Sequence, residues 1–111
     1  MGRSMAANLV NHGYEVTVYS RTKAKLTEYL AVTDVRWCDS IAECVKGQDA
    51  IITMVGYPKD IEDVHFGENG ILAHACRRSF LIDMTTTDPS LSIRIAQEGR
   101  SMGMHCLDAP V

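Results

Sequence analysis

A glycine and a later group of basic and hydroxyl side chains are spaced as a nucleotide site requires. Gly2 directly precedes an amphipathic helical pattern, and Ser20, Arg21 and Thr22 follow the β-branched stretch 15–19. In one class of parallel sheets, a glycine-rich turn opens a helix whose free N–H groups hold a pyrophosphate, and the residue that binds the adenosine ribose lies about 20 residues later. A guanidinium binds phosphate through two charge-assisted hydrogen bonds, and a hydroxyl adds another. These positions therefore predict a dinucleotide site that prefers NADP(H).

Simpler interpretations of the same residues stay open. Only Met1 and Gly2 represent the G-x-G-x-x-G pattern, and one glycine before a helix is common at ordinary helix starts. Arg21, with Lys23 and Lys25, also suits the solvated start of a basic helix, and we expect both lysines at the surface. An Asp or Glu in this region would favour NAD, which remains the alternative cofactor.

Segments with strand and helix periodicity alternate along the whole chain. We expect strands over 15–19, 35–37, 49–54, 79–84 and 104–107. We expect helices over 4–11, from Thr22, over 40–47 with a Ser40–Glu43 capping box, from Pro58, and from Asp88-Pro89 to about Gly103. The apolar stretch 49–54 is typical of a parallel strand covered on both faces. The alternation predicts an α/β fold of the Rossmann type, a doubly wound and mostly parallel sheet, here lacking its first strand because the pattern begins with a helix.

Composition excludes several classes of protein. The chain has 111 residues, which suits one domain, and a formal charge of −3, which argues against nucleic acid or a membrane surface as partner. Its apolar stretches are far shorter than the roughly 20 residues of a membrane span. The four cysteines match no zinc-binding spacing, and we interpret Cys44 and Cys106 in particular as reduced and mostly buried, as in a cytoplasmic protein. The histidines are scattered, and we predict no metal site.

The sequence resembles the β-hydroxyacid dehydrogenase family, which includes 3-hydroxyisobutyrate dehydrogenase and the tartronate semialdehyde and glyoxylate reductases. The resemblance covers essentially all of the chain. It is carried by segments that occur in the family's order, namely Met1-Gly2-Arg3-Ser4-Met5, Val18-Tyr19-Ser20-Arg21-Thr22-Lys23, Phe66-Gly67-Glu68-Asn69-Gly70, Asp83-Met84-Thr85-Thr86-Thr87-Asp88-Pro89 and Asp108-Ala109-Pro110-Val111.

The resemblance implies roles for individual residues. Met1 and Gly2 would line the pyrophosphate, and Ser20, Arg21 and Thr22 would hold the adenosine ribose phosphate. Thr86 would contact the nicotinamide end, although its hydroxyl also suits a helix cap beside Asp88. The nicotinamide-side ribose would be contacted by Met54, Val55 and Gly56. The substrate would be contacted by Asp108, Ala109, Pro110 and Val111.

The reaction implied by the resemblance is hydride transfer between a nicotinamide and a small 3-hydroxy acid or its semialdehyde. We expect residues 1–111 to be an incomplete dinucleotide-binding domain, without the first strand and without the C-terminal helical domain that carries the family's catalytic lysine and dimer surfaces. We therefore assign no catalytic residue, and we expect the chain alone to be inactive and marginally stable, with a homo-oligomer only where that domain is present.

Two other classes of protein remain as alternatives. One is a non-enzymatic nucleotide-binding or scaffold relative of the same family. The other is a flavodoxin-like or response-regulator domain, which shares the strand–helix alternation. The second does not explain the Ser20-Arg21-Thr22 segment together with the Asp108-Ala109-Pro110-Val111 ending.

Overall fold

The chain divides into two α/β units, each with parallel strands. The computed structural model describes residues 2–20, 35–54, 58–85 and 89–109, and the chain divides into Met1–Cys44 and Val45–Val111. In the first unit, helix α1 precedes a parallel pair of strands, and α3 follows. The elements are α1 (Gly2–Asn11), β1 (Thr17–Val18), β2 (Arg36–Trp37) and α3 (Ile41–Val45), which runs one residue past the division. The helix predicted from Thr22 lies outside the described residues.

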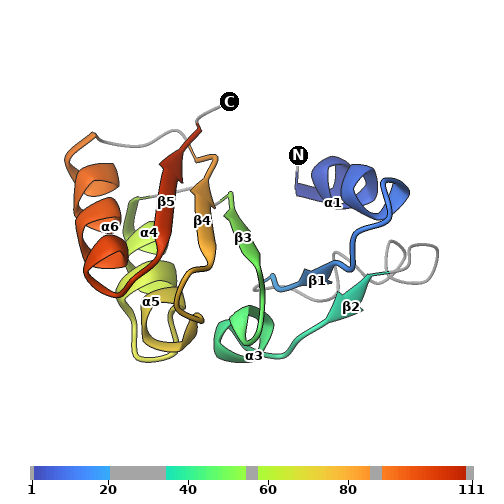
Figure 1. Cartoon of the computed structure of the whole chain (residues 1–111), viewed down its shortest axis with the longest axis horizontal. Coiled ribbons are helices and arrows are strands. Elements are labelled where there is room, and N and C mark those ends of the chain that lie inside the picture. The colour runs from blue at the N-terminus through green and yellow to red at the C-terminus, as the bar shows by residue number, and fades with distance from the viewer. Residues whose placement is uncertain (1, 21–34, 55–57, 86–88, 110–111) are drawn as a thin grey trace. The chain divides into compact units, whose positions relative to one another are not determined.

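The second unit is a three-stranded parallel sheet in the order β3-β4-β5. Its helices lie on one side of the sheet (Figure 1). The elements are β3 (Ala50–Thr53), α4 (Pro58–Phe66), α5 (Ile71–His74), β4 (Phe80–Asp83), α6 (Pro89–Ser101) and β5 (His105–Asp108). Every described strand pairs in parallel, and the described strands and the helices expected between them occur in the predicted order, so the α/β class is confirmed.

Capping residues end helix α1 and begin helix α3 where the sequence predicts. Gly13, with φ of 89°, follows α1. Its N–H donates to the Val10 carbonyl at 3.0 Å, and the Tyr14 N–H donates to the Leu9 carbonyl at 3.1 Å. This is the Schellman arrangement, in which glycine adopts the left-handed conformation without steric cost. At the start of α3, the Ser40 hydroxyl accepts from the Glu43 N–H at 3.2 Å, as a capping residue does.

The core of the second unit lies between the sheet and its helices. Ile51 and Leu81 project from the covered face of the sheet, and Ile61 and Ile95 meet them from the helices, all at least nine-tenths buried. The prediction that β3 is covered on both faces is wrong. Side chains alternate along a strand, and on the other face Ile52, Phe80 and Leu107 are 39%, 48% and 56% exposed.

One further expectation needs correction. The strand predicted over 15–19 is shorter, because β2 offers only two partner residues to Thr17 and Val18. Cys44 and Cys106 are largely covered, as expected, and the most deeply buried cysteine is Cys38, which follows β2 directly.

Candidate functional site

The carboxyl ends of the three strands in the second unit bring two predicted site segments together. The Met84 N–H donates to the Thr53 carbonyl at 2.9 Å, and the Ala109 N–H donates to the Asp83 carbonyl at 2.8 Å. The chain therefore leaves β3, β4 and β5 at adjacent points of one edge. Met54 follows β3 there, Asp108 ends β5 and Ala109 follows it, so these predicted site residues lie at the edge where parallel sheets bind ligands.

Asp83 organises this edge. Its side chain is 4% exposed, and Oδ1 accepts two hydrogen bonds, from the Thr53 hydroxyl at 2.9 Å and from the Thr85 N–H at 3.0 Å. The carboxylate thus joins the end of β3 to the first residues after β4. Sequence reasoning gave Asp83 no role, although a buried strand ending in Asp and followed by three threonines is a signal that could have identified it.

His65 in α4 is a second buried polar group, and the charge of Asp83 acts on it. The Nδ1 atom lies 2.8 Å from the Ile61 carbonyl, which can only accept, so Nδ1 carries the proton and Nε2 carries a lone pair. Both Nε2 of His65 and Oδ2 of Asp83 are buried without a hydrogen-bond partner. Burial lowers the pKa of His65, while the Ile61 hydrogen bond and the Asp83 charge act against this shift. The imidazole is therefore neutral at pH 7.

The depressed pKa of His65 predicts acid sensitivity. Because the ordinary pKa of 6.5 is lowered by folding, the unfolded chain binds the proton more readily. The stabilisation is complete above about pH 6.5 and is lost as the pH falls through the folded-state pKa. We expect urea denaturation between pH 7.5 and 5 to show a falling free energy of unfolding, and His65→Gln to reduce that slope.

His12 provides the matched control for this measurement. Its Nδ1 makes the same contact with a carbonyl four residues earlier, that of Asn8 at 2.7 Å, but the side chain is exposed. His12→Gln should leave the acid slope in place. Equal slopes in the wild type and His65→Gln would show that the buried imidazole does not cause the pH dependence.

In the first unit, the structure describes Gly2 and Ser20 among the predicted site residues. Helix α1 begins at Gly2 and has no acidic residue in its first turn, which suits an anion at its N-terminus. Ser20 is half-buried and follows Tyr19, whose ring stacks on that of Trp37 with centroids 6.1 Å apart. Sequence reasoning did not single out this aromatic pair. The remaining predicted site residues lie outside the described residues, namely Met1, Arg21, Thr22, Val55, Gly56, Thr86, Pro110 and Val111.

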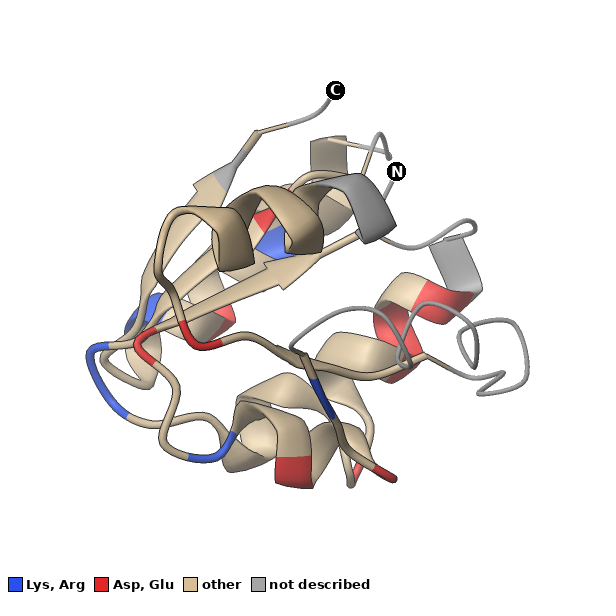
Figure 2. Ribbon diagram, turned by 90° about the vertical axis from the view of Figure 1, so that its right-hand side faces the viewer, with Lys and Arg blue, Asp and Glu red and all other residues tan. Residues whose placement is uncertain are grey.

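Other chemistries find little support in the described residues. No three His, Cys, Asp or Glu side chains there are grouped to hold a metal ion. Burial raises the pKa of Cys44 to about 12 and also raises that of Cys106, so both thiols are protonated at neutral pH and are poor nucleophiles. Acidic and basic residues are interspersed along the ribbon (Figure 2). None of the described helices combines the length and apolar character of a membrane span.

Comparison with known proteins gives one consistent result. A family profile described as the NAD binding domain of 6-phosphogluconate dehydrogenase matches residues 1–111. The uncharacterized oxidoreductase YkwC of Bacillus subtilis is 47% identical over the whole chain, which spans 38% of that relative's length. A solved structure of Mycobacterium tuberculosis 3-hydroxyisobutyrate dehydrogenase with L-serine superimposes with a TM-score of 0.88 at 29% identity, over the whole chain and 37% of that structure. The Myxococcus stipitatus imine reductase in complex with NADP+ gives 0.84 at 27% identity, over 97% of the chain and 36% of that structure.

Proposed function

Because this chain belongs to the family of NAD-binding domains of 6-phosphogluconate dehydrogenase, we propose that it binds NADP(H) for hydride transfer to or from a small 3-hydroxy acid or its semialdehyde. The observation that carries the proposal is the strand edge where Met54, Thr85 and Ala109 leave the sheet side by side, held together through Asp83. Within an α/β sheet of this family, that edge is where a nucleotide is expected.

The described residues fit a dinucleotide. In the first unit, the start of α1 offers free N–H groups without a competing acidic side chain, and Ser20 stands at the end of β1 to bind the adenosine ribose together with Arg21 and Thr22. In the second unit, Met54, Val55 and Gly56 would contact the nicotinamide-side ribose. Thr86 would contact the nicotinamide, and the positions Asp108, Ala109, Pro110 and Val111 would begin the substrate site.

The chemistry itself comes from the bound nicotinamide, which donates or accepts a hydride. The residues of this chain bind and orient that group. Proton exchange with the substrate hydroxyl needs a titratable side chain at the substrate, and none of the described residues is assigned that role.

Since the chain spans about a third of the length of the relatives it matches, the complete activity is a property that we propose for a longer protein. The unbridged cysteines support a reducing, cytoplasmic location.

Calorimetric titration with NADPH and NADH tests the proposal. We expect saturable binding of both, with NADPH bound at least 10-fold more tightly, because a 2′-phosphate adds charge-assisted hydrogen bonds. The titration should use the chain itself and a graft in which it replaces the corresponding 111 residues of the Bacillus subtilis relative. Absence of binding by a folded graft would overturn the cofactor site, and equal or tighter binding of NADH would overturn the NADP(H) preference.

A further inference from the structure

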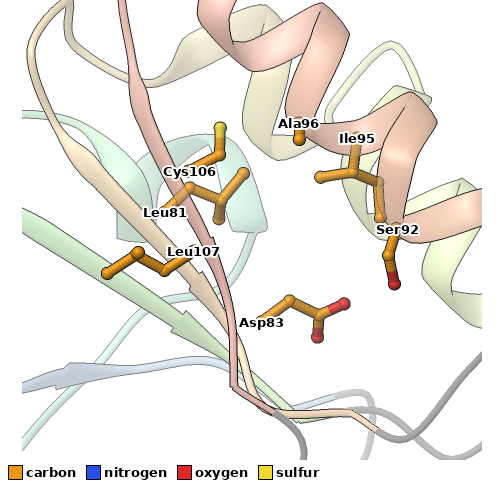
Figure 3. A pocket seen from close by; sticks show the side chains of 7 residues that line it. All are labelled: Leu81, Asp83, Ser92, Ile95, Ala96, Cys106 and Leu107. Carbon is orange, nitrogen blue, oxygen red and sulfur yellow. The ribbon is translucent and has the colours of Figure 1, made fainter. Parts of the chain in front are cut away.

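A small cavity lies between β4, β5 and α6 in the second unit. Its volume is about 20 Å³, and its walls are mostly apolar, with Leu81 and Ile95 on opposite sides. Two polar side chains stand at one end, Asp83 from the last position of β4 and Ser92 from the first turns of α6 (Figure 3). The carboxylate and the hydroxyl point into the same space. A cavity of this size holds one water molecule if polar groups line it.

One oxygen of the Asp83 carboxylate, Oδ2, lacks a hydrogen-bond donor. Its Oδ1 already accepts from Thr53 and Thr85, whereas Oδ2 has no partner although the residue is 4% exposed. Buried carboxylate oxygens in native proteins are nearly always hydrogen-bonded. His65 cannot supply the donor, because its proton lies on Nδ1 and is donated to Ile61. A donor to Oδ2 must therefore come from another group.

We propose that one water molecule in this cavity donates to Oδ2 of Asp83 and bonds the Ser92 hydroxyl. The water would join the end of β4 to the first turns of α6, the two elements that the connection through Thr86 links. This makes Ser92 a positioning residue for that connection, which contains Thr86. The inference rests on the proposed function, because Thr86 matters here as the contact to the nicotinamide end of the cofactor.

The test separates the two halves of the cofactor. Ser92→Ala removes the hydroxyl that holds the water, and we expect it to weaken NADPH binding about 3- to 10-fold, the effect of one hydrogen bond. Binding of 2′,5′-ADP, which lacks the nicotinamide half, should change less than about 2-fold. The control is Ser101→Ala at the exposed far end of α6, where the hydroxyl bonds the Glu98 carbonyl. Equal losses for both ligands, or no loss for either, would overturn the positioning role.

A crystal structure of the chain at high resolution checks the water independently of cofactor binding. Density for a water within hydrogen-bond distance of both Asp83 Oδ2 and Ser92 Oγ is the expected result. A direct bond between the two side chains, or a dry cavity, would overturn the proposal. If the wild type binds neither NADPH nor 2′,5′-ADP, the proposed function fails. The crystal structure still decides whether the water is present.

Discussion

Replacement of Arg21 by alanine is expected to weaken NADPH binding about 10- to 100-fold while NADH binding changes less than about 2-fold. Only NADPH carries the 2′-phosphate, and a guanidinium binds it through two parallel charge-assisted hydrogen bonds. Each such bond stabilises a complex by about 1.5–3 kcal/mol, and partial exposure to water reduces the sum. Calorimetric titration of both cofactors measures the effect directly.

Two companion variants make the Arg21 result specific. Arg21→Lys keeps the charge but loses the planar pair of donors, so we expect an intermediate loss of NADPH affinity. Lys23→Ala removes a neighbouring charge that is expected from the sequence to be solvated, and it should have a small effect that disappears at high salt. If Arg21→Ala lowers the affinity for NADPH and NADH by the same factor, Arg21 supports the fold of the site rather than binding the phosphate.

Much of the fold was predictable because its signals are local. Gly13 and Gly103 end helices α1 and α6 with positive φ, Pro58 and Pro89 begin α4 and α6, and Ser40 caps α3. Each of these residues acts within one turn of its own position, so neighbouring sequence suffices to predict its effect. The order of strands and helices follows from the same local patterns.

The parts that sequence did not predict depend on contacts between distant segments. Nothing near Ile52 indicates that its side of the sheet is exposed, since the stretch 49–54 is equally apolar on both faces. The Asp83 network joins Thr53, thirty residues earlier in the chain, to Thr85. The sequence around His65 is that of an ordinary helix, and only the structure shows that its ring is fully buried and feels the charge of Asp83.

The site was predicted unevenly for the same reason. Met54 and Ala109 were named from the family resemblance, and each directly follows a strand at the edge that such positions share in a parallel sheet. The Asp83 carboxylate, which fixes that edge, is identified by its burial and its two donors rather than by its position. The predicted contacts at Arg21, Val55 and Thr86 stay predictions that binding measurements will decide.

Asp83→Ala is expected to lower the free energy of unfolding by about 2–4 kcal/mol. The substitution leaves the Thr53 hydroxyl and the Thr85 N–H without their acceptor, and each buried donor left unpaired costs about 1–3 kcal/mol, partly relieved by water that enters the gap. Urea denaturation at pH 7 measures the loss. The exposed Asp63 in α4 provides the control, because Asp63→Ala removes the same carboxylate where water solvates it and should change the stability by less than about 0.5 kcal/mol.

Asp83→Asn separates hydrogen bonding from charge at the same position, and we expect it to cost less than half as much as Asp83→Ala. The amide oxygen can still accept from Thr53 and Thr85. The amide nitrogen then takes the place of Oδ2, an acceptor without a protein donor, and becomes a donor there. Removing the negative charge also removes an influence that raises the pKa of His65, so the loss of stability in acid should begin at the same pH and continue to a lower one. An Asn variant as unstable as the Ala variant would mean that the charge of Asp83, rather than its two accepted bonds, holds the strand edge together.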